Sequence, residues 1–293
     1  MKIALYGLSV SPDFIQELAR LFVLFKEKEI GYFIYRPFLE YLQQECAITP
    51  EIAGQFEDGN DLPDDVSLLL SIGGDGTLLK AFMIAKNRSI PLMGINSGRL
   101  GFLSDISRDE IDKALADILA GNYIIDERTV LELEMVNGTE SEFQYALNEI
   151  TVTKLDSASM INIHTYVNNE YLNTYWADGL IVATPTGSTA YSLSVGGPIL
   201  TPDSENFVIS PIAPHNLTVR PLVVPDHYSI ILQVEGRGLH FLTSVDSQSE
   251  PIYFSVLLKI RKASFKVKTI RLKDHSFFST LRNKLMWGVD KRN

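Results

Sequence analysis

The chain has 293 residues, of which 45% are hydrophobic and 21% are charged, a balance typical of a globular protein with a sizeable core. This composition excludes disordered, collagen-like and coiled-coil proteins. The 26 Lys and Arg residues against 36 Asp and Glu residues give a net charge of −10, which argues against general binding to nucleic acid or anionic membranes. Any phosphate site must therefore use backbone N–H groups, helix N-termini, a few placed cations or a metal ion.

The single cysteine, Cys46, excludes a disulfide framework, a zinc ribbon and a CxxC redox motif. No apolar run is long enough to span a bilayer, and residues 1–7 carry no signal-peptide pattern. We therefore expect a soluble cytoplasmic protein.

Residues 1–126 have the pattern of an α/β domain, because short apolar strands alternate with helical periodicity. In chain order, the predicted elements are a strand at 2–8, a helix from Pro12 through Phe25, a helix at 37–46, an acidic loop at 51–65, a strand at 66–72, a helix at 77–86, a strand at 90–95 and a helix at 109–120. The strand–turn–helix–strand unit around residue 75 is the strongest part of this prediction.

Residues 127–268 alternate polar and apolar residues with few helical stretches, which predicts a β-rich, sandwich-like domain. The predicted strands are 128–136, 143–154, 160–167, 171–176, 179–184, 227–234, 239–245, 251–260 and 264–272. The tail, residues 269–293, contains a helical stretch at 276–287, and we expect it to return to the first domain.

A glycine-rich turn, Gly73-Gly74-Asp75-Gly76, lies between a predicted strand and a predicted helix. Glycines let backbone N–H groups approach an anion there, and the helix N-terminus adds partial positive charge. Asp75 is a poor phosphate contact because like charges repel, so it is either a general base or a ligand to a metal ion on the phosphates. Lys80, one turn into the helix, is within reach of a phosphate. The alternative is a plain glycine turn with Asp75 as N-cap.

Other nucleotide and hydrolase motifs are absent from the sequence. The chain has no G-x-x-x-x-G-K-[ST] segment, and its glycine turn lacks the third glycine of the dinucleotide fingerprint. It also has no H-E-x-x-H and no G-x-S-x-G segment. A P-loop enzyme is excluded, and hydride transfer and hydrolysis lose their usual sequence support.

Two further segments carry polar groups that suit a ligand. Residues 176–198 end a predicted strand in a dense run of hydroxyl and glycine residues, which can bind a sugar, an amide or a base edge. The alternative is a Ser/Thr-rich loop with helix capping. Asn148 and Glu149 form a polar pair inside a predicted apolar strand, where they face either solvent or a ligand.

Taken in order, these segments resemble the NAD kinase family, with matches from about residue 70 to about residue 250. The glycine turn alone is weak evidence, because diacylglycerol kinases, sphingosine kinases and phosphofructokinases share versions of it, but the ordered set is specific. The matching segments are GGDGT at 73–77, GINSGRLGFL at 94–103, Asn148-Glu149, Asp178-Gly179, TPTGSTAY at 184–191 and ISPIAPH at 209–215.

The resemblance implies ATP-dependent transfer of a phosphoryl group to the 2′-hydroxyl of the adenosine ribose of NAD, giving NADP. It implies a Rossmann-like N-terminal domain similar to half of a phosphofructokinase, a β-rich C-terminal domain, a site between them, and a homodimer or homotetramer. Mg²⁺ is expected to arrive with ATP and not to be fixed by protein side chains. Some family members use polyphosphate or other nucleoside triphosphates as donor.

The resemblance also implies residue roles. Asp75 would be the general base, with Gly73 and Gly74 shaping the phosphate loop. Asn148 would contact the adenine and Glu149 the ribose hydroxyls. The other expected NAD contacts are Gly76 in the phosphate loop, Lys80, Phe102 beside the adenine, Trp176, Asp178 at the nicotinamide amide, Thr186, Thr189 at the adenine, Ala190, Tyr191, Ser192, Leu193, Ser194 and Gln248.

One position departs from the family. Many members carry a basic residue where this chain has Trp176, which therefore either meets the dinucleotide or packs in the core. The segment 209–215, which ends in His215, is expected to approach the site of a neighbouring subunit.

Two other functions share part of this pattern. A lipid kinase would share Gly74-Asp75-Gly76, but an acidic chain without an amphipathic basic helix offers no membrane-docking surface. A non-catalytic NAD sensor would bind NAD without turnover, yet a sensor has no use for a base at position 75. NAD kinase activity is therefore the leading hypothesis.

Overall fold

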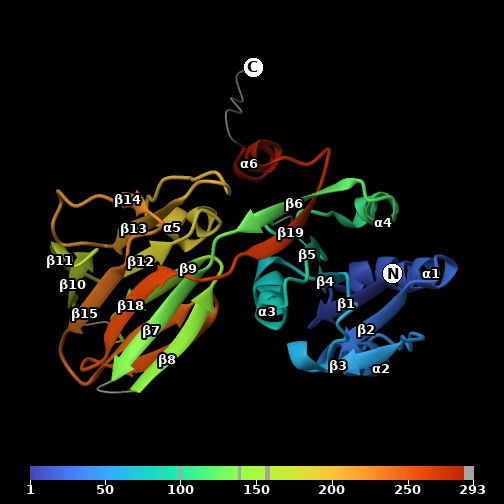
Figure 1. The fold of residues 1–293 in the computed structure, drawn as a ribbon, viewed down its shortest axis with the longest axis horizontal. Coiled ribbons are helices and arrows are strands. Elements are labelled where there is room, and N and C mark those ends of the chain that lie inside the picture. The colour runs from blue at the N-terminus through green and yellow to red at the C-terminus, as the bar shows by residue number, and fades with distance from the viewer. Residues whose placement is uncertain (87, 99–100, 138–139, 156–158, 287–293) are drawn as a thin grey trace. The chain divides into compact units, whose positions relative to one another are not determined.

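A computed structural model describes residues 1–86, 88–98, 101–137, 140–155 and 159–286 (Figure 1). It divides into two compact units, one formed by Met1–Glu127 with Val267–Asn293 and the other by Arg128–Lys266. Within the described residues, no helix is both long and apolar enough to cross a membrane. Arg99 and Leu100 of the GINSGRLGFL segment, and Trp287 of the predicted tail helix, lie outside the described residues.

The first unit is built on a seven-stranded sheet with the strand order β3-β2-β1-β4-β5-β19-β6. Neighbouring strands from β3 to β19 run parallel. The strands are β1 (Lys2–Gly7), β2 (Gly31–Tyr35), β3 (Gly54–Phe56), β4 (Leu68–Ile72), β5 (Leu92–Ile95), β6 (Tyr123–Arg128) and β19 (Val267–Leu272). The helices are α1 (Ile15–Glu27), α2 (Arg36–Gln44), α3 (Asp75–Ala85), α4 (Ile111–Leu119) and α6 (Phe277–Leu285), with short 3-10 turns at Pro12–Phe14, Gly59–Asp61 and Arg108–Glu110.

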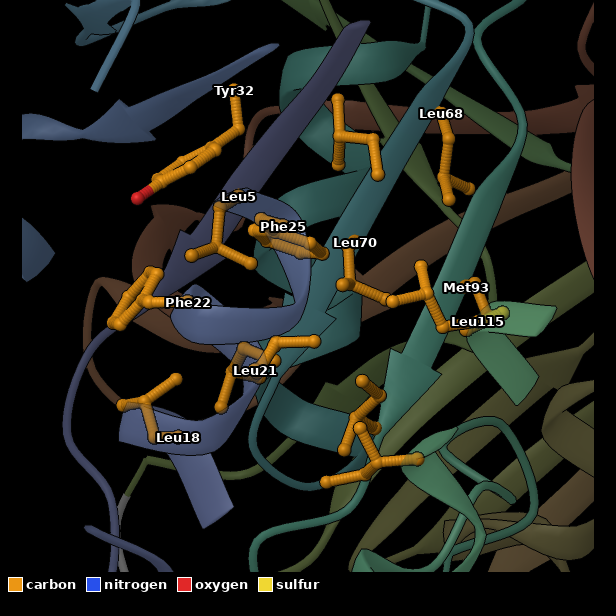
Figure 2. Close-up of a cluster of buried hydrophobic side chains, with 14 of the residues drawn as sticks. Leu5, Leu18, Leu21, Phe22, Phe25, Tyr32, Leu68, Leu70, Met93 and Leu115 are labelled. Carbon is orange, nitrogen blue, oxygen red and sulfur yellow. The ribbon is translucent and has the colours of Figure 1, made fainter. Parts of the chain in front are cut away.

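Helices cover both faces of this sheet because its strands are apolar on both sides. Side chains alternate along a strand, so Leu68 and Leu70 of β4 enter the cluster shared with α1 and α4, whereas Leu69 points to the opposite face. Figure 2 shows Leu21 and Phe25 of α1 packed against that cluster. Helix α3 packs on β4 and β5. Each fully buried side chain of this size contributes roughly 1.5–3 kcal/mol.

The strand order places the glycine loop (residues 73–76) at a position suited to a ligand. From β1 the chain passes to β2 on one side, and it later returns to β4 on the other side of β1. Ligands in open α/β sheets bind beyond the carboxyl ends of the strands where the order reverses in this way. The glycine loop follows the carboxyl end of β4 directly.

The strand β19 corrects the expected end of the β-rich domain at residue 268, because Val267 and Lys268 already belong to the first unit. It pairs in parallel with β5 and lies between β5 and β6, so the boundary expected between residues 268 and 269 falls inside it. The strand pairs with the first sheet because this position buries its apolar side chains Val267, Ile270 and Leu272. Strands β2 and β3 were not predicted, because β3 has only three residues and lies within an acidic segment.

The second unit consists of two six-stranded antiparallel sheets, with the orders β11-β10-β15-β18-β7-β8 and β14-β13-β12-β9-β16-β17. The strands of the first sheet are β7 (Leu131–Asn137), β8 (Glu140–Ala146), β10 (Ile161–Val167), β11 (Glu170–Ala177), β15 (Ile230–Glu235) and β18 (Leu257–Lys262). Those of the second are β9 (Glu149–Thr153), β12 (Gly179–Ala183), β13 (Asn206–Ile212), β14 (Leu222–Pro225), β16 (His240–Val245) and β17 (Gln248–Tyr253). A 3-10 turn (Gly187–Thr189) and the short helix α5 (Tyr191–Ser194) follow β12.

The two sheets pack face to face as a β-sandwich. Their shared core includes Leu133 and Ile163 from one sheet with Val182 and Phe207 from the other. On the outer face of the second sheet, Ile181 packs with residues of the segment that follows α5.

Two long predicted strands are in fact broken. Residues 143–154 divide between β8 and β9, which belong to different sheets, and residues 251–260 divide between β17 and β18. Strands β13 and β14 were not predicted.

Candidate functional site

The glycine loop of the first unit is shaped by Gly73 and leaves open space above α3. Gly73 has a φ of 148°, and a Cβ atom there would collide with the side chain of Thr77, so glycine is required. Gly74 is the N-cap of α3 and Asp75 is its first residue, so the unpaired N–H groups of the first turn and their partial positive charge lie at the loop. A Cβ atom at Gly74 or Gly76 would meet nothing within 4 Å. The loop can therefore receive an anion.

The carboxylate of Asp75 is held by backbone N–H groups of the segment that follows β5. Its Oδ2 accepts from Phe102 at 2.9 Å, and its Oδ1 accepts from Leu103 at 3.1 Å and from Ser104 at 2.9 Å. A Cβ atom at Gly101 would collide with this carboxylate, so the close approach requires glycine. Three directed hydrogen bonds fix the orientation of Asp75, which does not cap its own helix.

A lysine that we did not predict lies at this carboxylate. Lys284 of α6 has its Nζ 3.8 Å from Asp75 Oδ2 and 4.5 Å from the centroid of the Phe102 ring. Lys80, which we did predict, is exposed on α3. Because Lys284 is far from Asp75 in the sequence, no local pattern indicates this contact.

In the second unit, one carboxylate organises the turn that carries Asn148 and Glu149. Asp246 Oδ2 accepts from the N–H of Leu147 at 2.8 Å, and its Oδ1 accepts from the N–H groups of Asn148 at 2.8 Å and Glu149 at 3.1 Å. Asp246 follows β16 with a φ of 51° and donates its own N–H to the Glu149 carbonyl at 3.0 Å. These bonds take N–H groups that a strand would use, so Asn148 lies in a turn and the prediction that the pair lies inside one strand is wrong.

The side chains of this turn present acceptors that the protein leaves unused. Asn148 Oδ1 and Glu149 Oε2 are buried and have no hydrogen-bond partner in the part of the chain that the structure describes. The Glu149 carboxyl group does accept the backbone N–H of Tyr191. Burial, and then the charge of Asp246, raise the pKa of Glu149 to about 8, while burial raises the pKa of Asp246 to about 6. Glu149 is therefore largely protonated at neutral pH in the free protein.

The hydroxyl-rich loop (residues 184–194) is pinned against this turn. Thr184 Oγ1 donates to the Leu147 carbonyl at 2.6 Å and accepts from the N–H of Gly187 at 3.1 Å. A Cβ atom at Gly187 would collide with the backbone of Asn148. The fold thus brings the loop and the turn, which are separated in sequence, into one cluster at the end of neighbouring strands β12, β9 and β16.

The hydroxyl groups of this loop divide into two sets. Ser188 and Ser192 are fully buried, and Ser192 Oγ lies 3.0 Å from Ser210 Oγ. Tyr191 and Ser194 are exposed, while the remaining expected contacts of the loop are buried or half-buried, namely Thr186, Thr189, Ala190 and Leu193. The exposed set is available to a ligand, whereas the buried serines hold the loop.

The residues expected at the nicotinamide end have partners of their own. Asp178 pairs with Lys154, with 2.7 Å between Oδ1 and Nζ. Trp176 is 50% exposed and lies outside the core, and its ring contacts that of His215 in a tilted arrangement with 4.2 Å between the centroids. Gln248 is exposed at the start of β17, two residues beyond Asp246. Among the described residues, no group of three His, Cys, Asp or Glu side chains is arranged to hold a metal ion.

Solved structures of other proteins share the fold of this chain. Yeast NADH kinase complexed with NADH matches with a TM-score of 0.88 and 21% identity, over 99% of this chain and 88% of that one. An NAD kinase from Archaeoglobus fulgidus in complex with ATP matches with a TM-score of 0.72 and 24% identity, over 98% and 99% of the two chains. The fold is therefore that of the NAD and NADH kinases.

Family models and curated relatives give the closer assignment. The model of the ATP-NAD kinase N-terminal domain matches residues 56–123, and that of the ATP-NAD kinase C-terminal domain matches residues 147–272. Proteins named NAD kinase from Cytophaga hutchinsonii and Flavobacterium johnsoniae are 44% and 46% identical over 100% of this chain and 100% of their own length. The chain belongs to the ATP-NAD kinase family.

Proposed function

We propose that the protein is an NAD kinase, which transfers the γ-phosphoryl group of ATP to the 2′-hydroxyl of the adenosine ribose of NAD. The observation that carries the proposal is a pair of buried side-chain oxygens, Asn148 Oδ1 and Glu149 Oε2, that have no hydrogen-bond partner among the described residues. A buried polar atom without a partner costs roughly 1–3 kcal/mol, and a ligand that brings donors removes this cost. The amino group of adenine and the ribose hydroxyls of NAD are such donors.

We propose Asp75 as the general base for the 2′-hydroxyl. Its Oδ2 accepts one backbone N–H bond, from Phe102, and so has a further lone pair for a hydroxyl proton. Strong basicity is not needed, because the proton leaves late in a loose phosphoryl-transfer transition state. The three N–H bonds supply the orientation that such a step needs.

The glycine loop is proposed to hold phosphates through the N–H groups of the first turn of α3. Mg²⁺ enters as part of the substrate MgATP and is coordinated by phosphate oxygens. ATP as donor is supported by the family description and by the archaeal relative solved with ATP.

The remaining expected NAD contacts are part of the same proposal, with Asp178 and Tyr191 assigned to the nicotinamide riboside. We also propose a homodimer or homotetramer, since apolar side chains are exposed at Trp176 and at Leu217, near the segment that ends in His215. Light scattering after gel filtration measures this directly. A cytoplasmic location is consistent with the free thiol of Cys46.

The test is a coupled assay in which purified protein, MgATP and NAD form NADP, detected by an NADP-specific dehydrogenase. Wild-type protein is expected to form NADP. Asp75→Asn is expected to lose several orders of magnitude in turnover while NAD binding, measured by calorimetry, changes little. Folded wild-type protein that makes no NADP from ATP or polyphosphate would overturn the proposal, and near-normal turnover of Asp75→Asn would overturn the base assignment alone.

A further inference from the structure

Lys284 brings to Asp75 a positive charge whose N–H groups donate no hydrogen bond to any residue that the structure describes. Its Nζ lies 3.8 Å from Asp75 Oδ2, which is an ion pair but is too long for a hydrogen bond. The same Nζ lies 4.5 Å above the ring of Phe102, an attraction that consumes no N–H donor. Lys284 therefore combines proximity to the carboxylate with donors left for an anion.

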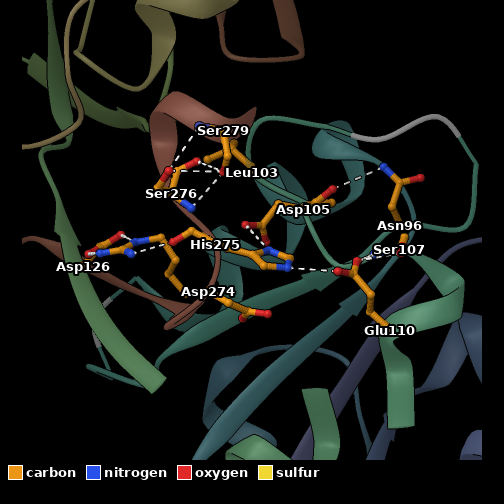
Figure 3. A network of polar contacts seen from close by, with 12 residues as sticks. Asn96, Leu103, Asp105, Ser107, Glu110, Asp126, Asp274, His275, Ser276 and Ser279 are labelled. Carbon is orange, nitrogen blue, oxygen red and sulfur yellow. Dashed lines mark hydrogen bonds and ion pairs between the residues drawn. The ribbon is translucent and has the colours of Figure 1, made fainter. Parts of the chain in front are cut away.

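The segment that delivers Lys284 is anchored by ionic contacts at its start. His275 lies between two carboxylates, with Nδ1 3.2 Å from Asp105 Oδ2 and Nε2 3.0 Å from Glu110 Oε1, as Figure 3 shows. Arg271 pairs with Asp126 and donates to the His275 carbonyl at 2.8 Å. His275 thus ties the chain just before α6 to the segment that follows Ser104, whose N–H binds Asp75, and Arg271 ties it to β6.

Helix α6 itself buries no side chain. It begins at Ser276, whose hydroxyl accepts the N–H of Ser279 at 3.1 Å, and its Phe278 is 58% exposed. Its Phe277 and Leu281 are only half-buried, so α6 gains less from the hydrophobic effect than a helix with a fully buried face. The helix places Lys284 beside Asp75 and over the ring of Phe102.

A cation at this position would reduce the repulsion between Asp75 and the phosphoryl group in the proposed reaction. A phosphoryl group that approaches Asp75 meets a negative charge, within a chain whose net charge is −10. An ammonium group beside that carboxylate offsets the repulsion and can donate to the equatorial oxygens on which charge is spread in the transition state. Lys80, exposed on α3, makes no comparable contact with Asp75 among the described residues.

We propose that Lys284 is a catalytic residue that stabilises the transferring phosphoryl group next to Asp75. This inference rests on the proposed function, because it assigns a residue to that same reaction. The competing interpretation is a surface ion pair without a role in catalysis. Partly exposed pairs add little to stability, so that interpretation predicts that loss of Lys284 changes neither unfolding nor turnover appreciably.

The experiment compares full-length wild type, Lys284→Met, Lys284→Arg and the control Arg282→Met in the coupled NADP assay, with kcat and KM measured for MgATP and NAD. The control removes the same charge from the same helix. Lys284→Met is expected to lower kcat on the order of 10²-fold, as loss of one transition-state donor does. Lys284→Arg is expected to recover most of the turnover, and Arg282→Met to stay within about twofold of wild type.

Thermal unfolding of the same variants shows whether a loss of activity reflects unfolding, since the melting temperature of Lys284→Met is expected within about 2 °C of wild type. Lys284→Gln replaces Lys284→Met if that variant does not fold. Three outcomes would overturn the inference in an active wild type: kcat of Lys284→Met within about threefold of wild type, a loss confined to KM, or an equal loss in Arg282→Met. A wild type without NADP formation would instead overturn the proposed function.

Discussion

The carboxylate of Asp246 accepts the backbone N–H of Glu149 at 3.1 Å, and its charge opposes ionisation of the Glu149 side chain. One residue therefore fixes the turn and helps to keep its neighbour protonated. Both effects act at the two side-chain oxygens, Asn148 Oδ1 and Glu149 Oε2, that have no partner in the described part of the chain. The turn thus holds polar groups in place for a ligand, and burying them without partners lowers the stability of the free protein.

Asp246→Asn is expected to destabilise the protein by about 1–3 kcal/mol, because the amide places an NH₂ group against a backbone N–H that has lost its acceptor. The KM for NAD should rise by about tenfold as the turn loosens. Denaturant unfolding and the NADP assay measure the two effects. Asp203→Asn, an exposed aspartate of the same unit, is the control and should change stability by less than about 0.5 kcal/mol. Equal stability of the two variants would contradict the role of Asp246.

NAD binding is expected to release a proton between about pH 6 and pH 8. The pKa of Glu149 is raised to about 8 in the free protein, and ribose hydroxyls that donate to the carboxylate favour its charged form and lower that pKa. Affinity for NAD should therefore rise with pH up to about 8 and level off above it. Calorimetry in buffers of different ionisation enthalpy counts the proton. Glu149→Gln should bind weakly without proton release, and proton release that persists in this variant would assign it to another group.

The same group should make the free protein less stable as pH rises. Burial raises the pKa of Glu149 from 4.5 to about 8, so the folded state prefers the protonated carboxyl group. Its stabilising effect is complete below pH 4.5 and is lost as pH rises toward 8. Glu149→Gln is therefore expected to melt at a higher temperature than wild type at pH 8 and at nearly the same temperature at pH 4.5, although it loses activity. A variant less stable than wild type at pH 8 would contradict this account.

Gly76→Ala is expected to raise stability and lower activity. Its methyl group would meet nothing within 4 Å of protein, and alanine stabilises a helix by up to about 1 kcal/mol relative to glycine. The same methyl group enters the space proposed for phosphates, so kcat/KM for MgATP should fall by at least about tenfold. Gly31→Ala, at the start of β2 with its nearest contact 3.9 Å away, is the control and should keep full activity. Full activity of Gly76→Ala would place the phosphates elsewhere.

His275 is expected to stabilise the first unit at acidic and neutral pH. Its hydrogen bond with Asp105, and further interactions with Glu110, raise the pKa of His275 from 6.5 to about 9. This contribution is fully present below pH 6.5 and is lost as pH rises through 9. The melting temperature of His275→Gln should therefore fall below that of wild type at pH 6 and approach it above pH 9. The exposed His227→Gln serves as control, and a difference from wild type that does not depend on pH would contradict an ionic role.

Much of the fold could be predicted where the pattern is local. The continuous apolar run that forms β4 and the helical periodicity of α1 indicate their own structures, because burial decides both. The break between β8 and β9 depends instead on Asp246, about a hundred residues later, and no local pattern contains it. The position of β19 beside β5 could not be predicted either, because the two strands are distant in the sequence and their pairing depends on how the sheet assembles.

The candidate site follows the same division. The glycines at the strand end and the aspartate at the helix start could be identified from the sequence, because they form a motif of consecutive residues. Other parts of the site depend on contacts between segments that are distant in the sequence. These are the hydrogen bonds from the segment after Gly101 to Asp75, the ion pair of Lys284 with Asp75 and the ion pair of Asp178 with Lys154. They follow only from the folded chain.

The position of β19 has a consequence for the synthesis of the protein. Because this strand lies between β5 and β6 but is translated after residue 266, a nascent chain cannot complete the first sheet until the whole second unit has been translated. The second unit, contiguous in sequence, can fold earlier, while β5 waits with an open edge. A chain truncated before β19 would thus contain all strands of the sandwich but an incomplete first sheet.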